Sequence, residues 1–129
     1  MKGGGTVDIV DRLVDRLNEI EGLAFVRDAR TDNEPEQNYG IVRLTGENSA
    51  VWADDVMVEQ AFGLAVNVFV KDERAEWLNQ IQAKLEAADL YYRFSGRSYH
   101  VETDAVEWEW TATHYGPLLV DDGEARTDG

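Results

Sequence analysis

Residues 57–70 read MVEQAFGLAVNVFV, and this stretch decides the fold. Every second residue from Phe62 to Val70 is apolar, which predicts one face of an extended strand. The residues between them, from Ala61 to Phe69, are mostly small or apolar, so the second face is largely apolar too. A strand that is apolar on both faces lies in the centre of a sheet or against a neighbouring subunit.

Two amphipathic helices are predicted on either side of this strand. The first follows Thr6, which occupies the position of an N-cap, and its apolar residues recur every three or four positions until Gly22 ends the helix. The second helix begins after Asp72, which we expect to cap it, and ends near Asp89. Trp77 widens its apolar stripe.

The remaining elements are predicted to be short strands. A strand at Leu23–Val26 precedes an exposed loop over Arg27–Asn38, and Tyr39–Thr45 is a strand that turns at Gly46–Ser49 and returns from Ala50. After the second helix, the segments 91–94 and 98–102 form a hairpin around residues 95–97.

The last strand shows a clean alternation of apolar and polar residues. Val106, Trp108, Trp110 and Ala112 alternate with acidic residues and threonines up to Thr113. This pattern is typical of a half-buried strand, and it predicts that both tryptophans lie in the core.

These elements predict an α+β fold: a mostly antiparallel sheet with two amphipathic helices packed on one face. Residues 1–119 form a single domain, and the acidic residues 120–129 form a flexible tail because they have no apolar periodicity.

The charge of the chain is strongly negative. Its 129 residues include 12 Lys and Arg against 26 Asp and Glu, which gives a formal net charge of −14. Phosphate backbones and anionic membranes repel such a chain, so specific binding to DNA or membranes is not expected. The sequence has no cysteine, which excludes disulfides and thiolate metal sites, and no apolar run of membrane-spanning length. We therefore expect a soluble protein in the cytoplasm.

No catalytic, cofactor or metal site is predicted. The two histidines, His100 and His114, lack a second ligand at helical or turn spacing. The adjacent acids Asp54 and Asp55 would point to opposite faces of a strand and would not converge on one metal. The chain is predicted not to be an enzyme.

Several segments together resemble a known family. They are Tyr39–Gly46, Val51–Asp55, Ala65–Asp72, the helix containing Leu85 and Glu86, and Val106–Trp110. In order and spacing this pattern is similar to small proteins from the head–tail connector gene clusters of long-tailed bacteriophages. The resemblance covers the chain from about Asp8 to Thr113, and the Gly-rich start and the acidic tail depart from it.

The resemblance implies a tail terminator, also called a tail-completion protein. Such proteins form a hexameric ring in the virion, assembled in the host cytoplasm, that caps the tail tube and joins it to neck proteins. DNA passes through the ring without specific binding. The residues expected at interfaces are Trp52, Asp54, Asp55, Phe69 and Trp77, and those expected to line the bore are Asp32, Glu34, Glu36 and Glu47.

Three alternatives remain open at this point. A head-completion or stopper protein belongs to the same assembly. A small metal- or ligand-binding enzyme domain would use Asp54, Asp55 and His100. An acidic DNA mimic is the third, although arginines interrupt the negative surface that it needs.

Overall fold

The computed structural model describes residues 6–28, 38–53 and 56–121, and for residues 46–53, 56–59 and 121 it describes the backbone alone. In chain order the elements are β1 (Thr6–Asp8), α1 (Ile9–Leu17), β2 (Ala24–Arg27), β3 (Tyr39–Ala53), β4 (Val56–Val70), α2 (Ala75–Ala87), β5 (Tyr91–His100), β6 (Ala105–Tyr115) and β7 (Leu119–Asp121).

The main sheet has five strands in the order β2-β3-β4-β6-β5. Only the β2–β3 pair is parallel, and the other three pairs are antiparallel. The strand β4 contains the doubly apolar stretch of the sequence, and it pairs with β3 on one side and with β6 on the other. The predicted α+β class and the central position of this strand are confirmed.

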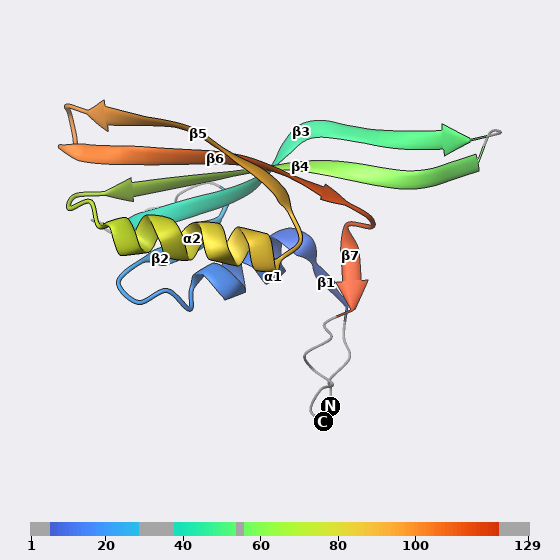
Figure 1. The fold of residues 1–129 in the computed structure, drawn as a ribbon, viewed down its shortest axis with the longest axis horizontal. Helices are drawn as coiled ribbons and strands as arrows, with labels where there is room; N and C mark the ends of the chain where they lie inside the picture. Colours follow the sequence, from blue (N-terminus) through green and yellow to red (C-terminus); the bar gives the residue numbers. More distant parts are fainter. Residues whose placement is uncertain (1–5, 29–37, 54–55, 122–129) are drawn as a thin grey trace, which may run out of the picture.

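Both helices lie on the same face of the sheet, as Figure 1 shows. The core forms between them and the sheet because β4 and β6 direct their apolar residues toward the helices. Its fully buried members are Val10, Leu17, Val42, Leu64, Val66, Val68, Val70, Ile81, Leu85 and Trp110. Trp108 is also buried, so the prediction that both tryptophans of β6 are core residues is confirmed.

The first helix begins later and ends earlier than predicted. Asp8 is the N-cap: its carboxylate accepts a hydrogen bond of 2.7 Å from the backbone N–H of Val10. Thr6, the predicted cap, lies in β1 instead. The helix ends at Leu17, and the side chain of Asn18 then exchanges two hydrogen bonds, of 2.7 and 3.0 Å, with the backbone of Phe25. This exchange anchors β2 beside the end of α1.

The second helix also starts differently from the prediction. Its N-cap is Arg74, which makes no side-chain capping hydrogen bond, and Asp72 lies two residues earlier. The helix extends to Ala87, close to the predicted end at Asp89, which has a positive φ of 61°. The apolar spacing therefore predicted the helix correctly, but the predicted N-cap lies two residues before the observed one.

The first hairpin turns later than predicted. Residues 46–49 belong to a continuous β3, and the register irregularity between Leu44 and Asn48 accommodates them as a bulge-like shift. The last paired residues of the hairpin are Ala53 and Val56. The predicted turn at Gly46–Ser49 is therefore wrong, because the polar residues are absorbed within the strand.

The second predicted hairpin is wrong for the same reason. Residues 91–100 form one strand, with a register irregularity between Phe94 and Gly96 that leaves Ser95 without a partner across the ladder. The chain reverses instead after His100, where Asp104 has a positive φ of 54° and its N–H donates to the carbonyl of Val101.

The end of the described chain is ordered further than predicted. Val120 and Asp121, which the sequence places in the tail, belong to β7 and pair with Val7 and Thr6 of β1. The small β1–β7 sheet lies beside the main body (Figure 1). Residues 122–129 of the predicted tail and residues 29–37 of the predicted loop lie outside the described residues.

Candidate assembly surfaces

The strands β3 and β4 continue well beyond the rest of the sheet. β6 pairs with β4 from Ala61 to Val70, and one residue further along β4 the carbonyl of Gln60 accepts a hydrogen bond of 2.8 Å from the N–H of Gly116. Past this point the two strands pair only with each other (Figure 1). We call residues 46–59 the arm. Among the described residues, neither a helix nor a third strand pairs with this two-stranded projection.

The composition of the arm is distinctive. Its sequence, GENSAVWADDVMVE, contains four acidic residues and neither Lys nor Arg. It also contains several large apolar residues, Val51, Trp52, Val56, Met57 and Val58. An isolated two-stranded hairpin is only marginally stable in water, so a partner surface is the usual reason for a long apolar one.

The opposite edge of the sheet is formed by β5. Its sequence, YYRFSGRSYH, contains two arginines and no acidic residue. Three of its aromatic side chains are exposed: Tyr91 by 71%, Phe94 by 39% and Tyr99 by 56%. The ring of Tyr91 meets that of Tyr115 edge to face, with centroids 5.3 Å apart. Together, Tyr91, Arg93, Thr111 and Thr113 line a shallow hollow over β5 and β6.

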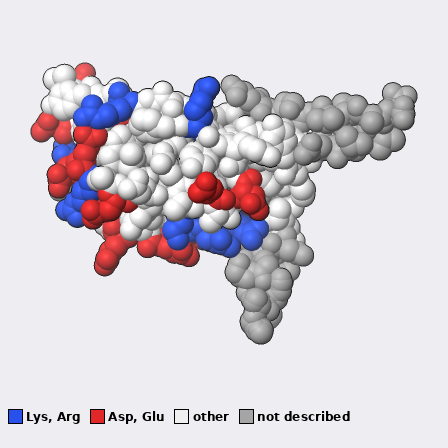
Figure 2. Space-filling model, in the orientation of Figure 1, with Lys and Arg blue, Asp and Glu red and all other residues white. Residues whose placement is uncertain are grey.

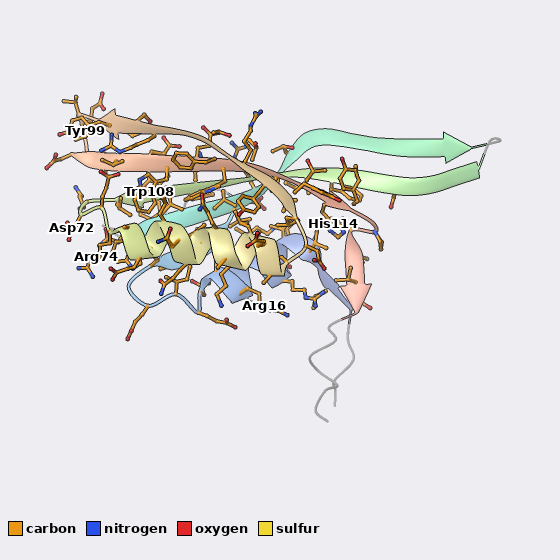
Figure 3. All side chains as sticks on the ribbon, viewed as in Figure 1. Arg16, Asp72, Arg74, Tyr99, Trp108 and His114 are labelled. Atoms are coloured by element: carbon orange, nitrogen blue, oxygen red, sulfur yellow. The ribbon has the colours of Figure 1, made fainter. Side chains whose placement is uncertain are left out.

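One arginine of β5 is tied to the body through Glu73. The guanidinium of Arg97 donates two hydrogen bonds to the carboxylate, of 2.8 and 2.6 Å, and the indole N–H of Trp108 donates a third, of 2.8 Å. The bonds from Arg97, opposed by partial burial, lower the pKa of Glu73 to about 2. Figure 3 shows Trp108 between β6 and α2, so this network joins the edge strand to the helix layer.

Charged side chains crowd the end of the body opposite the arm. Figure 2 shows acidic and basic groups mixed there, around the turns that lead into α2 and connect β5 with β6. Asp72, Glu73, Arg74 and Arg97 belong to this group, and Arg74 lies 3.5 Å from Asp72 and 4.7 Å from the centre of the Trp77 ring. The arginines already have acidic or aromatic partners in this region, so it is nearly self-compensated.

The face of the sheet away from the helices carries a polar cluster. Glu107 accepts hydrogen bonds from the amide of Asn67 at 2.6 Å, and its other oxygen lies 2.7 Å from Nε2 of His100. Phe69 stacks on Tyr39, with ring centroids 5.1 Å apart, and lies beside the His100 ring. The cluster therefore combines one carboxylate with a stacked aromatic pair on an uncovered face.

A small cavity lies between α1 and the end of α2. Its volume is about 130 Å³, and it is lined by apolar residues together with Arg12, Arg16, Asp89 and His114. His114 lies 2.9 Å from the carbonyl of Pro117, which holds the ring at the cavity wall. Figure 3 shows that Arg16 and His114 lie far from Tyr99. The cavity is separate from the aromatic edge.

The residues predicted at interfaces have different positions. Phe69 is half-buried on the uncovered face, where a neighbour can reach it. Trp52 belongs to the arm, its side chain is outside the described residues, and Asp54 and Asp55 lie outside them entirely. Trp77 was expected at an interface, but only 3% of it is exposed.

The burial of Trp77 has a clear physical cause. Its indole N–H donates a hydrogen bond of 3.1 Å to the carbonyl of Glu21, and its ring covers the turn at Gly22. A Cβ on Gly22 would lie 2.9 Å from this ring. The tryptophan therefore packs α2 against the turn that follows α1, and it is not exposed to a neighbouring subunit.

The residues predicted to line a bore remain predictions. Asp32, Glu34 and Glu36 lie outside the described residues, and for Glu47 only the backbone, within β3, is described. The alternative metal site on Asp54, Asp55 and His100 is equally untested. Within residues 6–28, 38–53 and 56–121, no group of three or more His, Asp or Glu side chains is placed to hold a metal ion.

Sequence reasoning missed the partners of His100 and Arg97. His100 was predicted to lack a second ligand at helical or turn spacing, and its partner is Glu107 on the next strand. Glu73 was not singled out at all, although it binds Arg97. In the sequence, the alternation in β6 indicates that Glu107 lies on the polar face. It does not indicate which residues of the neighbouring strands contact Glu107.

The comparisons with known proteins add no relative. No protein-family model matches this chain, and no curated protein sequence matches it. Among the described residues, no helix is both long enough and apolar enough to cross a membrane.

Proposed function

We propose that this chain is a structural virion protein, a tail terminator that forms a ring at the end of a phage tail tube and joins it to the neck. The observation that carries the proposal is the arm, an apolar two-stranded projection that leaves a well-packed body. The exposed aromatic edge of β5 gives the molecule a second adhesive surface. A subunit with two different adhesive surfaces is suited to assembly.

The sequence supports the same proposal independently. The order of segments from Tyr39 to Trp110 resembles connector proteins of long-tailed phages, and the net charge of −14 suits a conduit that DNA must cross without sticking. Loop acids such as Asp32, Glu34 and Glu36 are the proposed bore lining.

Light scattering after size-exclusion chromatography tests the proposal. We expect a closed ring of defined mass, either alone or on adding tail-tube protein, and capped tubes of uniform length by electron microscopy. A chain that stays monomeric in both conditions would contradict it. A monomer that assembles only on a portal complex would instead identify a stopper protein.

The bore lining needs a separate experiment. Replacing Asp32, Glu34 and Glu36 by Lys should leave folding and joining intact but slow DNA ejection, most strongly at low salt, because each lysine adds phosphate affinity. A matched control replaces Asp15, Glu21 and Glu86, all exposed on the helix side, by Lys. If both variants eject DNA at the same rate, the loop does not line the bore.

A further inference from the structure

The cavity between α1 and the end of α2 combines an apolar interior with a basic mouth. The buried part of its lining comes from α1, from β4 and from the segment after α2, and it consists of Ile9, Leu13, Leu64 and Leu90. Its volume is about 130 Å³. In another protein, an apolar cavity of about 150 Å³ holds benzene. The interior therefore accepts an apolar group of about four to six carbon atoms.

Two arginines stand at the mouth of this cavity. Arg12 and Arg16 are one turn apart on α1, so they project from the same side of the helix, and both are half-buried. Figure 2 shows basic side chains together on this side of the body, where Figure 3 labels Arg16. Arg12 forms no hydrogen bond or ion pair with any residue that the structure describes. Partial burial takes water from its N–H donors and leaves them ready for an anion.

The end of α2 does not account for the arginines. Cations are favourable near the free carbonyls at a helix C-terminus. Here, however, the carbonyls of residues 84–86 already accept hydrogen bonds from the backbone N–H groups of residues 88–90. Asp89, the acid in the lining, is exposed and makes no ion pair with Arg12. The mouth therefore keeps an excess of positive charge in a chain whose net charge is −14.

His114 forms a fixed wall of the cavity. The carbonyl of Pro117 can only accept a hydrogen bond, so Nε2 of His114 carries a proton and donates it over 2.9 Å. The same turn is tied to the start of α1, because the N–H of Ile9 donates to the carbonyl of Leu118 at 3.0 Å. A wall held in this way needs little ordering when a ligand binds, which favours affinity.

We propose that this cavity binds a small carboxylate with a short apolar chain, of the size of isovalerate. The chain lies against Leu13, Leu64 and Leu90, and the carboxylate meets the guanidinium of Arg12, whose planar fork matches two carboxylate oxygens. Apolar burial supplies affinity, and the arginine selects the charge. The inference goes beyond the proposed function and is independent of it, because the cavity lies apart from the arm and from β5.

A nuclear magnetic resonance titration of the full chain with isovalerate tests the site. We expect a dissociation constant of about 1 mM or tighter, with shifts at the backbone amides of Leu13, Leu90 and His114. Isovaleramide has the same shape without the charge and should bind at least tenfold more weakly. Acetate has the charge without the apolar chain and should also bind at least tenfold more weakly.

Each comparison can overturn the inference. If isovaleramide binds as tightly as isovalerate, the cavity selects apolar shape alone. If acetate binds as tightly, the arginines attract any anion. If isovalerate causes no shift at the lining residues up to about 20 mM, more than tenfold above the expected constant, the cavity is not a carboxylate site. These measurements use the unaltered chain, so they decide the question even if a variant fails to fold.

A charge-matched pair of variants assigns the role of Arg12. Arg12→Gln should weaken isovalerate binding at least tenfold and leave isovaleramide binding unchanged, because only the acid uses the guanidinium. Arg43→Gln removes the same charge from an exposed position of β3 outside the cavity, and it should change isovalerate binding by about twofold or less. Equal weakening by the two substitutions would mean that net charge alone acts, and the inference would fail.

Discussion

The strands β3 and β4 pass through two different environments. In the body, β4 lies between β3 and β6 under both helices, and Val66, Val68 and Val70 are fully buried. In the arm, the described parts of the same two strands pair only with each other. Both halves are rich in β-branched and aromatic residues. The difference teaches that strand-forming residues build a core only where a layer of helices covers them. Elsewhere the same residue types are available for contacts with other molecules.

The largest effect is expected in the body at Trp110. This residue is fully buried, meets Phe94 and Trp108 edge to face, and donates an indole hydrogen bond of 3.2 Å to Gln82. Trp110→Ala should lower the free energy of unfolding by about 3–5 kcal/mol because it leaves a large cavity. Urea denaturation measures this. A folded variant of unchanged stability that fails only to assemble would show that the tryptophan serves an interface.

Packing tightness should also differ between the body and the edge. A Cβ on Gly40 of β3 would lie 2.4 Å from the ring of Phe25, which β2 and Asn18 hold in place. Gly40→Ala should therefore cost about 1–3 kcal/mol. At Gly96 of β5, a Cβ would meet no atom within 4 Å, so Gly96→Ala should change stability by about 0.5 kcal/mol or less. Thermal unfolding of both variants checks the contrast, and equal losses would contradict it.

The link between β5 and the helices should depend on pH. The pKa of Glu73 is lowered from 4.5 to about 2, so its contribution is present above pH 4.5 and is lost as the pH falls toward 2. Because a third of this side chain is exposed, we expect about 1 kcal/mol after allowance for solvent screening.

Glu73→Gln should remove that part of the acid dependence, as measured by urea denaturation between pH 2 and pH 5. Glu76→Gln, an exposed acid in the first turn of α2, is the matched control. If the free energy of unfolding of Glu73→Gln falls between pH 5 and pH 2 as much as that of Glu76→Gln, the ion pair with Arg97 makes no contribution.

The smallest effect on folding is expected in the arm. Trp52 is paired with Met57, beyond the segment of β4 that pairs with β6. Trp52→Ala should therefore change the free energy of unfolding by about 0.5 kcal/mol or less. The same variant should associate more weakly in sedimentation experiments. A loss as large as that of Trp110→Ala would mean that the arm packs against its own body, and the contrast between the two halves would disappear.

Local patterns were sufficient for the layers of the fold. The alternation from Phe62 to Val70 predicted the central strand, and the alternation from Val106 to Ala112 predicted which face of β6 is buried. Both signals depend on residues a few positions apart. The same reasoning failed at turns, because Gly46–Ser49 and Ser95–Arg97 contain turn-forming residues that the strands absorb as irregularities.

The sequence by itself determined the fold class, the central strand, the tryptophan core and the negative charge, because composition and periodicity act locally. Only the tertiary structure decided that Trp77 is buried, that Glu107 joins Asn67 to His100, and that β3 and β4 outrun the sheet as an arm. These features depend on register and on the lengths of neighbouring strands. Register is set by packing between segments far apart in the chain, which no local pattern records.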